Sequence, residues 1–307
     1  MKSFGLLGLC GALLAIGASL GRHHIFPAAG SSEVGAGGAI AKTQQIIAQG
    51  PEQSHQDILT ALKQADVIYL GETHTDMADH IAQLEIITEM HQSLGNIAIG
   101  LEMFQRPFQS VLDQYIAGEI TEADLIEQSE YETRWGFDWE LYAPIMRFAQ
   151  ANQIPLIALN TPREITKKVA RQGLASLTGP DLEHIPPLDE IDTSDENYQA
   201  MVAQVFGHHG GHGHSGPSFE NFFAAQVLWD ETMAEAVADF VTASPDTQVI
   251  VLAGEGHIVY DFGIPSRVKR RLGENFVGQS VLLNPTSTQP ELADFFWISD
   301  NTSDGIQ

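Results

Sequence analysis

Short apolar runs rich in Val, Ile and Leu recur along the chain and alternate with longer segments of helical periodicity. Uninterrupted apolar runs of this kind are typical of strands buried on both faces, as in parallel sheets covered by helices. The runs span residues 67–70, 97–101, 154–159, 249–253 and 281–283. The pattern therefore predicts an α/β fold with a mainly parallel β-sheet and flanking helices.

Two intervals between the predicted strands are too long for single crossover helices. Residues 103–153 and 161–247 both show helical patterns. We predict that they form a smaller helical cap inserted over one edge of the sheet. Residues 42–290 then form one α/β domain, and residues 291–307 form a C-terminal tail.

The N-terminal region has the pattern of a targeting segment. A run of apolar and small residues at positions 4–20 lies between Lys2 and Arg22. This arrangement is typical of a signal peptide or an N-terminal membrane anchor. We predict such a segment over residues 1–24 and a linker over 25–41. The protein is then expected to be exported, either periplasmic or attached to the membrane and facing the periplasm.

The charge and the cysteine content of the chain argue against certain partners and certain kinds of metal site. The chain has 15 Lys and Arg against 40 Asp and Glu, a formal charge of −25. Such an acidic surface repels phosphate backbones, which argues against a nucleic-acid partner. Cys10 is the single cysteine, so an internal disulfide or a cysteine-based zinc or iron–sulfur site is excluded.

A histidine tract interrupts the acidic second half of the chain. Residues 172–266 contain 15 acids and neither Lys nor Arg. Within this interval, a Gly-rich loop carries several imidazoles, which are suitable ligands for Zn, Ni, Cu or Co when neutral. We predict a separate metal site at His208, His209, His212 and His214.

Polar and ionisable residues directly follow four of the predicted strands. Because the carboxyl ends of parallel strands lie at one edge of a sheet, these side chains are expected to converge. Imidazoles and carboxylates in one place can hold a divalent cation or act as general acid and base. The acid–base candidates are Glu72, His74, Glu102, Asn160 and His257, and the metal-ligand candidates are His74, His257 and Glu255.

The order of these motifs resembles the ChaN-like haem-binding family, which is itself similar to the Tiki, TraB and erythromycin-esterase group. The resemblance extends over residues 60–275. The stretches that carry it include 67–74, 100–104, 139–145, 226–234 and 254–257.

The resemblance implies a parallel sheet with a smaller helical domain, export, and haem bound between the two protomers of a homodimer. It also implies a tyrosine as the axial ligand, an anionic donor that suits ferric iron. Tyr142 lies inside one of the motifs and is the first candidate, and Tyr260 is the second. The candidate basic residues for the haem propionates are Arg163, Lys167, Lys168 and Lys269.

Three functions stay open on this basis, one of which is metal buffering through the histidines at 208–214. The first is an exported haem-binding protein that serves iron acquisition. The alternative is a metal-dependent or acid–base hydrolase that uses the cluster at the strand ends. Glu255 favours the alternative, because the family usually has Asn at this position.

Overall fold

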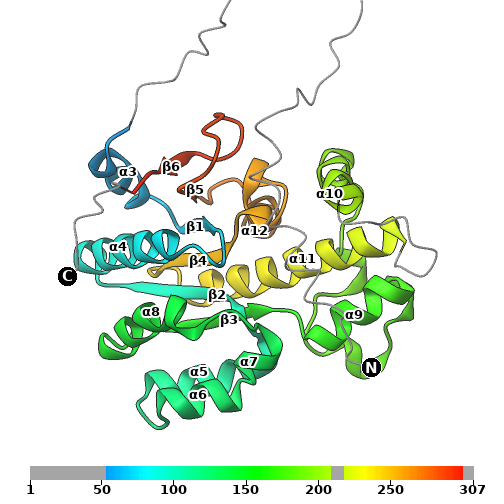
Figure 1. The fold of residues 1–307 in the computed structure, drawn as a ribbon, viewed down its shortest axis with the longest axis horizontal. Helices are drawn as coiled ribbons and strands as arrows, with labels where there is room; N and C mark the ends of the chain where they lie inside the picture. The colour runs from blue at the N-terminus through cyan, green and yellow to red at the C-terminus, as the bar shows by residue number, and fades with distance from the viewer. Residues whose placement is uncertain (1–52, 209–217, 300–307) are drawn as a thin grey trace, which may run out of the picture.

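A computed structural model describes residues 53–208 and 218–299 of the chain (Figure 1). Its centre is a six-stranded sheet in the order β3-β2-β4-β1-β5-β6, and all neighbouring strands run parallel. The predicted α/β fold with a parallel sheet is thus confirmed. The strands are β1 (Val67–Glu72), β2 (Ile97–Gln105), β3 (Leu156–Asn160), β4 (Gln248–Gly254), β5 (Gly278–Leu283) and β6 (Phe295–Trp297).

The sheet separates two hydrophobic cores, because alternate side chains of a strand point to opposite faces. In β1, Val67 and Tyr69 belong to one core, and Ile68 and Leu70 belong to the other. The first core is covered by α9 (Arg163–Gln172), α10 (Glu196–His208), α11 (Phe219–Ala243) and α12 (Ile264–Leu272). The second is covered by α3 (His55–Leu62), α4 (Met77–Leu94), α5 (Gln109–Ile116), α6 (Glu122–Gln128), α7 (Tyr131–Arg134) and α8 (Trp139–Ala151).

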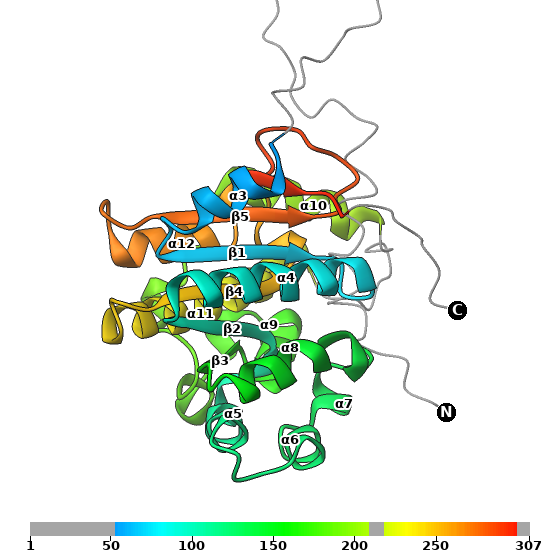
Figure 2. The ribbon, with the colours of Figure 1, turned by 90° about the vertical axis from the view of Figure 1, so that its left-hand side faces the viewer.

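The two predicted insertions are mainly helical, but they cover opposite faces of the sheet instead of one edge. Residues 103–153 supply helices α5 to α8 to the core of α4, and residues 161–247 supply α9 to α11 to the other core. Figure 2 shows α4 and α8 in front of the sheet and α11 behind it. A parallel sheet has two apolar faces, so helices are needed on both.

Strand β4 brings distant parts of the chain together. It pairs with β1 on one side and with β2 on the other, so that Glu72 lies opposite Gly254. Strand β3 adds Asn160, which lies opposite Gln105 of β2. The carboxyl ends of β1, β2, β3 and β4 therefore form one continuous edge.

The turn between β1 and α4 is fixed by two carboxylates. Asp76, the N-cap of α4, accepts a hydrogen bond of 2.9 Å from the backbone N–H of Ala78. Asp79 accepts one of 2.8 Å from the backbone N–H of Thr73. These bonds hold the turn that carries His74.

Residues 295–297, which the sequence places in the C-terminal tail, form the short strand β6. In this strand Phe295 lies opposite Val281 of β5. The side chain of Trp297 is fully buried and stacks on His55, with ring centroids 3.8 Å apart. The stacking ties the end of the sheet to helix α3.

The N-terminal predictions concern residues outside the described ranges. These are the signal peptide or anchor at 1–24 and the linker at 25–41. The same holds for His209, His212 and His214, whereas His208 is the last residue of α10. Across residues 53–208 and 218–299, no helix combines the length and the apolar character needed to cross a bilayer.

Candidate functional site

The structure brings the five acid–base candidates together at the carboxyl edge of the sheet. Glu72 and Asn160 are the last residues of β1 and β3, and Glu102 lies three residues before the end of β2. His74 and His257 lie in the segments that follow β1 and β4. All five are buried, with at most 6% of their surface exposed. The residues are Glu72, His74, Glu102, Asn160 and His257.

Glu72 is surrounded by hydrogen-bond donors. Its Oε1 lies 2.6 Å from the hydroxyl of Tyr142 and 2.8 Å from Nδ1 of His74, and its Oε2 accepts a bond from the amide of Gln83. Nδ1 of His80 lies 3.5 Å from Oε2. Burial raises the pKa of Glu72, but the hydrogen bond and the charge of His74 outweigh burial, so the pKa is lowered.

Helix α4 orients this end of the site. Nε2 of His80 lies 3.1 Å from the backbone carbonyl oxygen of His74, and Nδ1 of His80 lies 3.1 Å from Oε1 of Gln83. The three-residue spacing places His80 and Gln83 on one helix face, which points into the protein. The helix therefore holds both Glu72 and the turn after it.

The imidazole of His257 lies between two carboxylates. Its Nδ1 is 2.6 Å from Oδ1 of Asp230, and its Nε2 is 3.5 Å from Oε1 of Glu102. Burial lowers the pKa of His257, but the charges of Glu102 and Asp230 prevail and raise it to about 10. Burial raises the pKa of Glu102, but His257 prevails and lowers it to about 2.

Gly254 joins the two ends of the site. Its backbone N–H donates a hydrogen bond of 2.7 Å to Oε2 of Glu102. A Cβ atom at this position would lie 2.8 Å from Cε1 of His74, which is too close for a real contact. Only glycine lets the His74 ring lie against the end of β4.

The result is a buried row of groups with alternating charge. Burial lowers the pKa of His74, but its hydrogen bond to Glu72 and the charge of Glu102 prevail and raise it. Each ionisable group in the row thus has an oppositely charged neighbour, which is the condition for burying charge without a large penalty. We call Glu72, His74, Glu102, His257 and Asp230 the charged row.

A cavity of about 220 Å³ opens beside the charged row. The ring centroid of Trp135 lies 4.8 Å from that of His74, and that of Trp229 lies 6.0 Å from that of His257. Both tryptophans line the cavity, whereas neither histidine does. The apolar lining is formed by Met103, Trp135, Phe137 and Trp229, and we call its three aromatic residues the aromatic wall. The polar lining includes Asn160, Thr161, Arg163, Thr166 and Lys167.

The two tyrosines predicted as haem ligands lie in different places, and neither lines the cavity. Tyr142 is 1% exposed, and its hydroxyl is bound to Glu72. Burial and the charge of Glu72 raise the pKa of Tyr142 well above its ordinary value, which disfavours an anionic phenolate. Tyr260 is half-buried at φ 59°, and its ring stacks on Phe262 with centroids 5.3 Å apart.

The four basic residues predicted to bind the haem propionates also lie in different places. Arg163 and Lys167 line the cavity. Lys168 lies outside it and forms an ion pair of 2.7 Å with Asp181. Lys269 is exposed on α12, away from the cavity.

The described residues hold no cluster of three or more His, Cys, Asp or Glu side chains placed to bind a metal ion. The nitrogens of His257 face Asp230 and Glu102 instead. The third predicted ligand, Glu255, is half-buried in the short 3-10 helix that follows β4. The divalent-metal hypothesis therefore gains no support from this part of the chain.

Sequence reasoning missed the residues that complete the charged row from the helices. Asp230 lies on α11, and its Oδ2 accepts a hydrogen bond of 2.6 Å from the hydroxyl of Tyr198 on α10. Gln226, one turn before Asp230, places its Nε2 3.1 Å from Nδ1 of His257. Polar residues at a spacing of four within an apolar helix were the available signal, because such residues share a face and need partners there.

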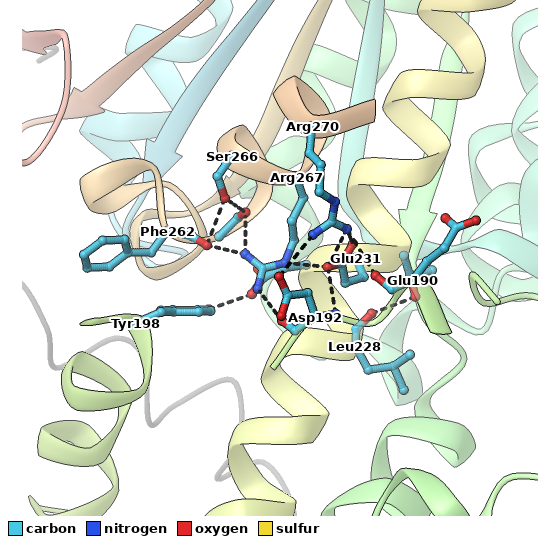
Figure 3. Close-up of polar contacts among 12 residues, drawn as sticks. Glu190, Asp192, Tyr198, Leu228, Glu231, Phe262, Ser266, Arg267 and Arg270 are labelled. Atoms are coloured by element: carbon cyan, nitrogen blue, oxygen red, sulfur yellow. Dashed lines mark hydrogen bonds and ion pairs between the residues drawn. The ribbon is translucent and has the colours of Figure 1, made fainter. Parts of the chain in front are cut away.

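A second polar cluster, centred on Glu231, connects α11 to α12 (Figure 3). The carboxylate of Glu231 is fully buried and lies 2.6 Å from Nη2 of Arg270 and 2.7 Å from Nη1 of Arg271. Arg267 donates a hydrogen bond of 2.9 Å to the carbonyl oxygen of Gly263, and its guanidinium lies over the Tyr198 ring. The cluster therefore fixes the loop between His257 and α12.

The sequence profile of the family described as "Haem-binding uptake, Tiki superfamily, ChaN" matches residues 58–268, well over half of the chain. The chain belongs to this family. The structure described as "Cofacial heme binding to ChaN of Campylobacter jejuni" is similar to this ChaN-like chain at a TM-score of 0.63 and 19% identity. The similarity covers 80% of this chain and 91% of that one, and it shows a shared fold.

Two other proteins are similar to this ChaN-like chain. One is much longer than the chain, and the other has a lower structural similarity. Protein RETICULATA-RELATED 5, chloroplastic, of Arabidopsis thaliana is 24% identical over 264 residues, which cover 78% of this chain and 34% of the plant protein. This chain therefore spans about a third of that relative. An erythromycin esterase mutant in an open conformation has a TM-score of 0.44 at 15% identity, covering 74% of this chain and 72% of that one.

Proposed function

We propose that this ChaN-like protein binds haem at the cavity beside the charged row. The observation that carries the proposal is a cavity lining that combines basic residues with apolar aromatic ones. The basic residues include Arg163 and Lys167, and the apolar residues are Met103, Trp135, Phe137 and Trp229. Haem has matching chemistry, because it combines a flat apolar ring system with two carboxylates.

The size of the cavity suits one edge of the porphyrin. At about 220 Å³ it is smaller than typical small-molecule pockets of about 300–1,000 Å³. The rest of the ring would lie across the mouth of the cavity and need a second cover. A second copy of the chain would provide it, in line with the cofacial haem binding described for the Campylobacter relative.

The cavity itself offers no strong iron ligand. Among the residues that the structure describes, no His, Tyr or Cys side chain lines it. Tyr142 can reach an iron only by leaving Glu72, whereas the side chain of Tyr260 is partly accessible but stands outside the cavity. Changing each tyrosine to phenylalanine separates these two choices.

We further propose that haem binding takes place outside the cytoplasm and serves iron acquisition. The apolar run at residues 4–20, between Lys2 and Arg22, supports export. The family description names uptake. A fusion of residues 1–40 to a reporter that is active only after export tests this part of the proposal.

A haemin titration followed by absorbance tests the binding itself. We expect saturable binding with a shifted Soret band for the protein without residues 1–40. Phe137→Ala removes part of the aromatic wall and is expected to weaken binding. Phe148→Ala on α8, outside the cavity, is the matched control. Absence of a Soret change with the intact site contradicts the proposal.

A second candidate function, acid–base hydrolysis, is favoured by the charged row. Paired carboxylates and imidazoles with pKa values moved in opposite directions are a common arrangement in hydrolytic sites. The side chains of His74 and His257 are buried and do not reach the cavity, so hydrolysis requires the aromatic wall to open. Turnover of a chromogenic ester that is lost in His257→Gln supports this candidate, and no turnover by the intact protein contradicts it.

A further inference from the structure

The polar lining of the cavity contains buried hydroxyl groups without a hydrogen-bond partner. Thr161 and Thr166 are only 1% and 3% exposed, and their Oγ1 atoms form no hydrogen bond within the described structure. Both residues line the cavity. Buried polar atoms are nearly always paired in folded proteins, so two unpaired hydroxyls at one cavity indicate a place for a ligand.

Two cations of the cavity lining stand outside the ion pairs of this region, although the charge of Glu164 acts on Lys167. Neither Arg163 nor Lys167 takes part in an ion pair within the described part of the chain. The guanidinium of Arg163 donates instead to the backbone carbonyl oxygen of Thr133. By contrast Lys168, one residue after Lys167, is paired with Asp181.

The charge at the cavity is opposite to the charge of the whole protein. Three of the 15 Lys and Arg residues line the cavity, namely Arg134, Arg163 and Lys167. Among the acids of the described residues, only the exposed Glu132 does so. Arg134 forms ion pairs with Glu130 at 2.9 Å and with Glu164 at 3.1 Å. Glu164 also acts on Lys167 through its charge, whereas Arg163 and Lys167 form no ion pair with a described carboxylate.

The start of helix α9 adds to this positive potential. The helix has ten residues and begins at Arg163, and Pro162 at its N-cap provides no side-chain hydrogen bond. The helix dipole places partial positive charge at this end, which favours an anion nearby. The first N–H groups themselves have acceptors, because that of Arg163 donates to Oε1 of Gln105 and those of Ile165 and Thr166 donate to the carbonyl oxygen of Pro162. Thr161 precedes this first turn, and Thr166 and Lys167 follow directly after it.

We propose that one protomer contains a complete subsite for the carboxylate of an apolar ligand, formed by Thr161, Arg163, Thr166 and Lys167. The two cations balance the negative charge, and the two hydroxyls donate to the carboxylate oxygens. The aromatic wall binds the apolar part of the ligand. The inference rests on the proposed function in one respect: haem, through its propionate carboxylates, would be one of the ligands that this subsite binds.

The side-chain oxygen of Asn160 indicates which group lies next to the carboxylate of the ligand. Oδ1 of Asn160 is buried and unpartnered, and Asn160 lines the cavity. Its Nδ2 already donates a hydrogen bond of 2.8 Å to the backbone carbonyl oxygen of Glu102, which fixes the orientation of the amide. An acceptor in this position needs a donor, so a water molecule or a ligand hydroxyl fits here and a carboxylate does not.

Calorimetric titration of the protein with 3-phenylpropionate tests the subsite without haem. The neutral analogue 3-phenylpropanamide has the same shape and serves as the ligand control. We expect saturable binding of the carboxylate and binding of the amide about tenfold weaker or more, because hydrogen bonds to a charged group are stronger than those to a neutral one. Equal affinity for both compounds, or no saturable binding of the carboxylate, overturns the inference.

Variants locate the binding. Arg163→Gln and Thr166→Val are expected to weaken 3-phenylpropionate binding about tenfold or more, and Lys168→Gln, on the same helix, is expected to leave it unchanged. Thr166→Val keeps the shape of the side chain, so it tests the hydroxyl even if Arg163→Gln unfolds the protein. Equal loss in Lys168→Gln, or no loss in Thr166→Val, contradicts the assignment.

Haemin titration of the same proteins separates this inference from the proposed function. Haemin binding without binding of 3-phenylpropionate would overturn the subsite and leave the haem proposal standing. Binding of 3-phenylpropionate that depends on Arg163, in a protein that does not bind haemin, would support the subsite and overturn the haem proposal.

Discussion

Nδ1 of His257 lies 2.6 Å from Oδ1 of Asp230, with both side chains buried. The imidazole comes from the turn after β4, and the carboxylate comes from the middle of α11. This contact therefore connects the edge of the sheet to the helix that covers it. It also raises the pKa of His257, together with the charge of Glu102.

Removal of this contact is expected to be costly. Asp230→Asn leaves the His257 imidazolium without one of its two carboxylates, and breaking a buried ion pair typically costs about 3–5 kcal/mol of unfolding free energy. The pKa of His257 is expected to fall. Urea denaturation measures the first effect, and an NMR titration of the imidazole measures the second. The exposed Asp239→Asn on the same helix is the control, with an expected change of about 0–1 kcal/mol.

The pKa values of the charged row predict how stability depends on pH. His257 has a pKa of about 10 in the folded protein against 6.5 ordinarily, so its contribution is complete below pH 6.5 and is lost as pH rises through 10. Glu102 has a pKa of about 2 against 4.5, so its contribution is complete above pH 4.5 and is lost as pH falls through 2.

We therefore expect these two groups to make the free energy of unfolding largest between pH 4.5 and 6.5 and smaller on either side. Denaturation by urea across a pH series measures this profile. In His257→Gln the decline above pH 6.5 should flatten. A wild-type stability that rises steadily from pH 7 to 10 would show that the pKa of His257 is not raised.

Gly254→Ala is expected to displace the His74 ring. The added Cβ would lie 2.8 Å from Cε1 of His74, and such overpacking usually costs about 1–3 kcal/mol. Gly207→Ala on α10 is the matched control, because nothing lies within 4 Å of its added Cβ and alanine is the better helix former. Equal stability of the two variants would mean that His74 does not lie against β4.

The arginine cluster around Glu231 is expected to control the order of the loop before α12. Glu231→Gln leaves Arg267, Arg270 and Arg271 without their shared carboxylate, at an expected cost of about 3–5 kcal/mol. Hydrogen exchange of residues 258–263 should rise, because Arg267 binds carbonyl oxygens of this loop. Unchanged exchange in a folded variant would show that the cluster does not hold the loop.

Much of the site could be predicted because strand ends are a local property of the sequence. Glu72, Glu102 and Asn160 each lie within two residues of the end of an apolar run, and His257 follows such a run by four residues. A parallel sheet places the carboxyl ends of these runs at one edge. Asp230 and Tyr198 could not be placed in this way. Their contacts depend on how α10 and α11 pack, and strand patterns do not report helix packing.

The residues predicted to bind haem show the same difference between what the sequence determines and what the tertiary structure determines. Arg163, predicted from the sequence as a propionate ligand, lines the cavity because it begins the helix that follows β3. Tyr142 lies in a family motif, yet the tertiary structure directs its hydroxyl to Glu72. A motif identifies a residue, but the partner of that residue is chosen by the elements packed around it.

The sequence by itself determined the fold class, five of the six strands and the edge where the acid–base residues meet, because hydrophobic periodicity reports which side chains must be buried. Only the tertiary structure decided that these residues pair with each other in a buried row of alternating charge. It also decided that an aromatic cavity with two unpaired cations lies beside the row. Those features depend on distances between segments far apart in the chain, and burial patterns along a sequence contain no such distances.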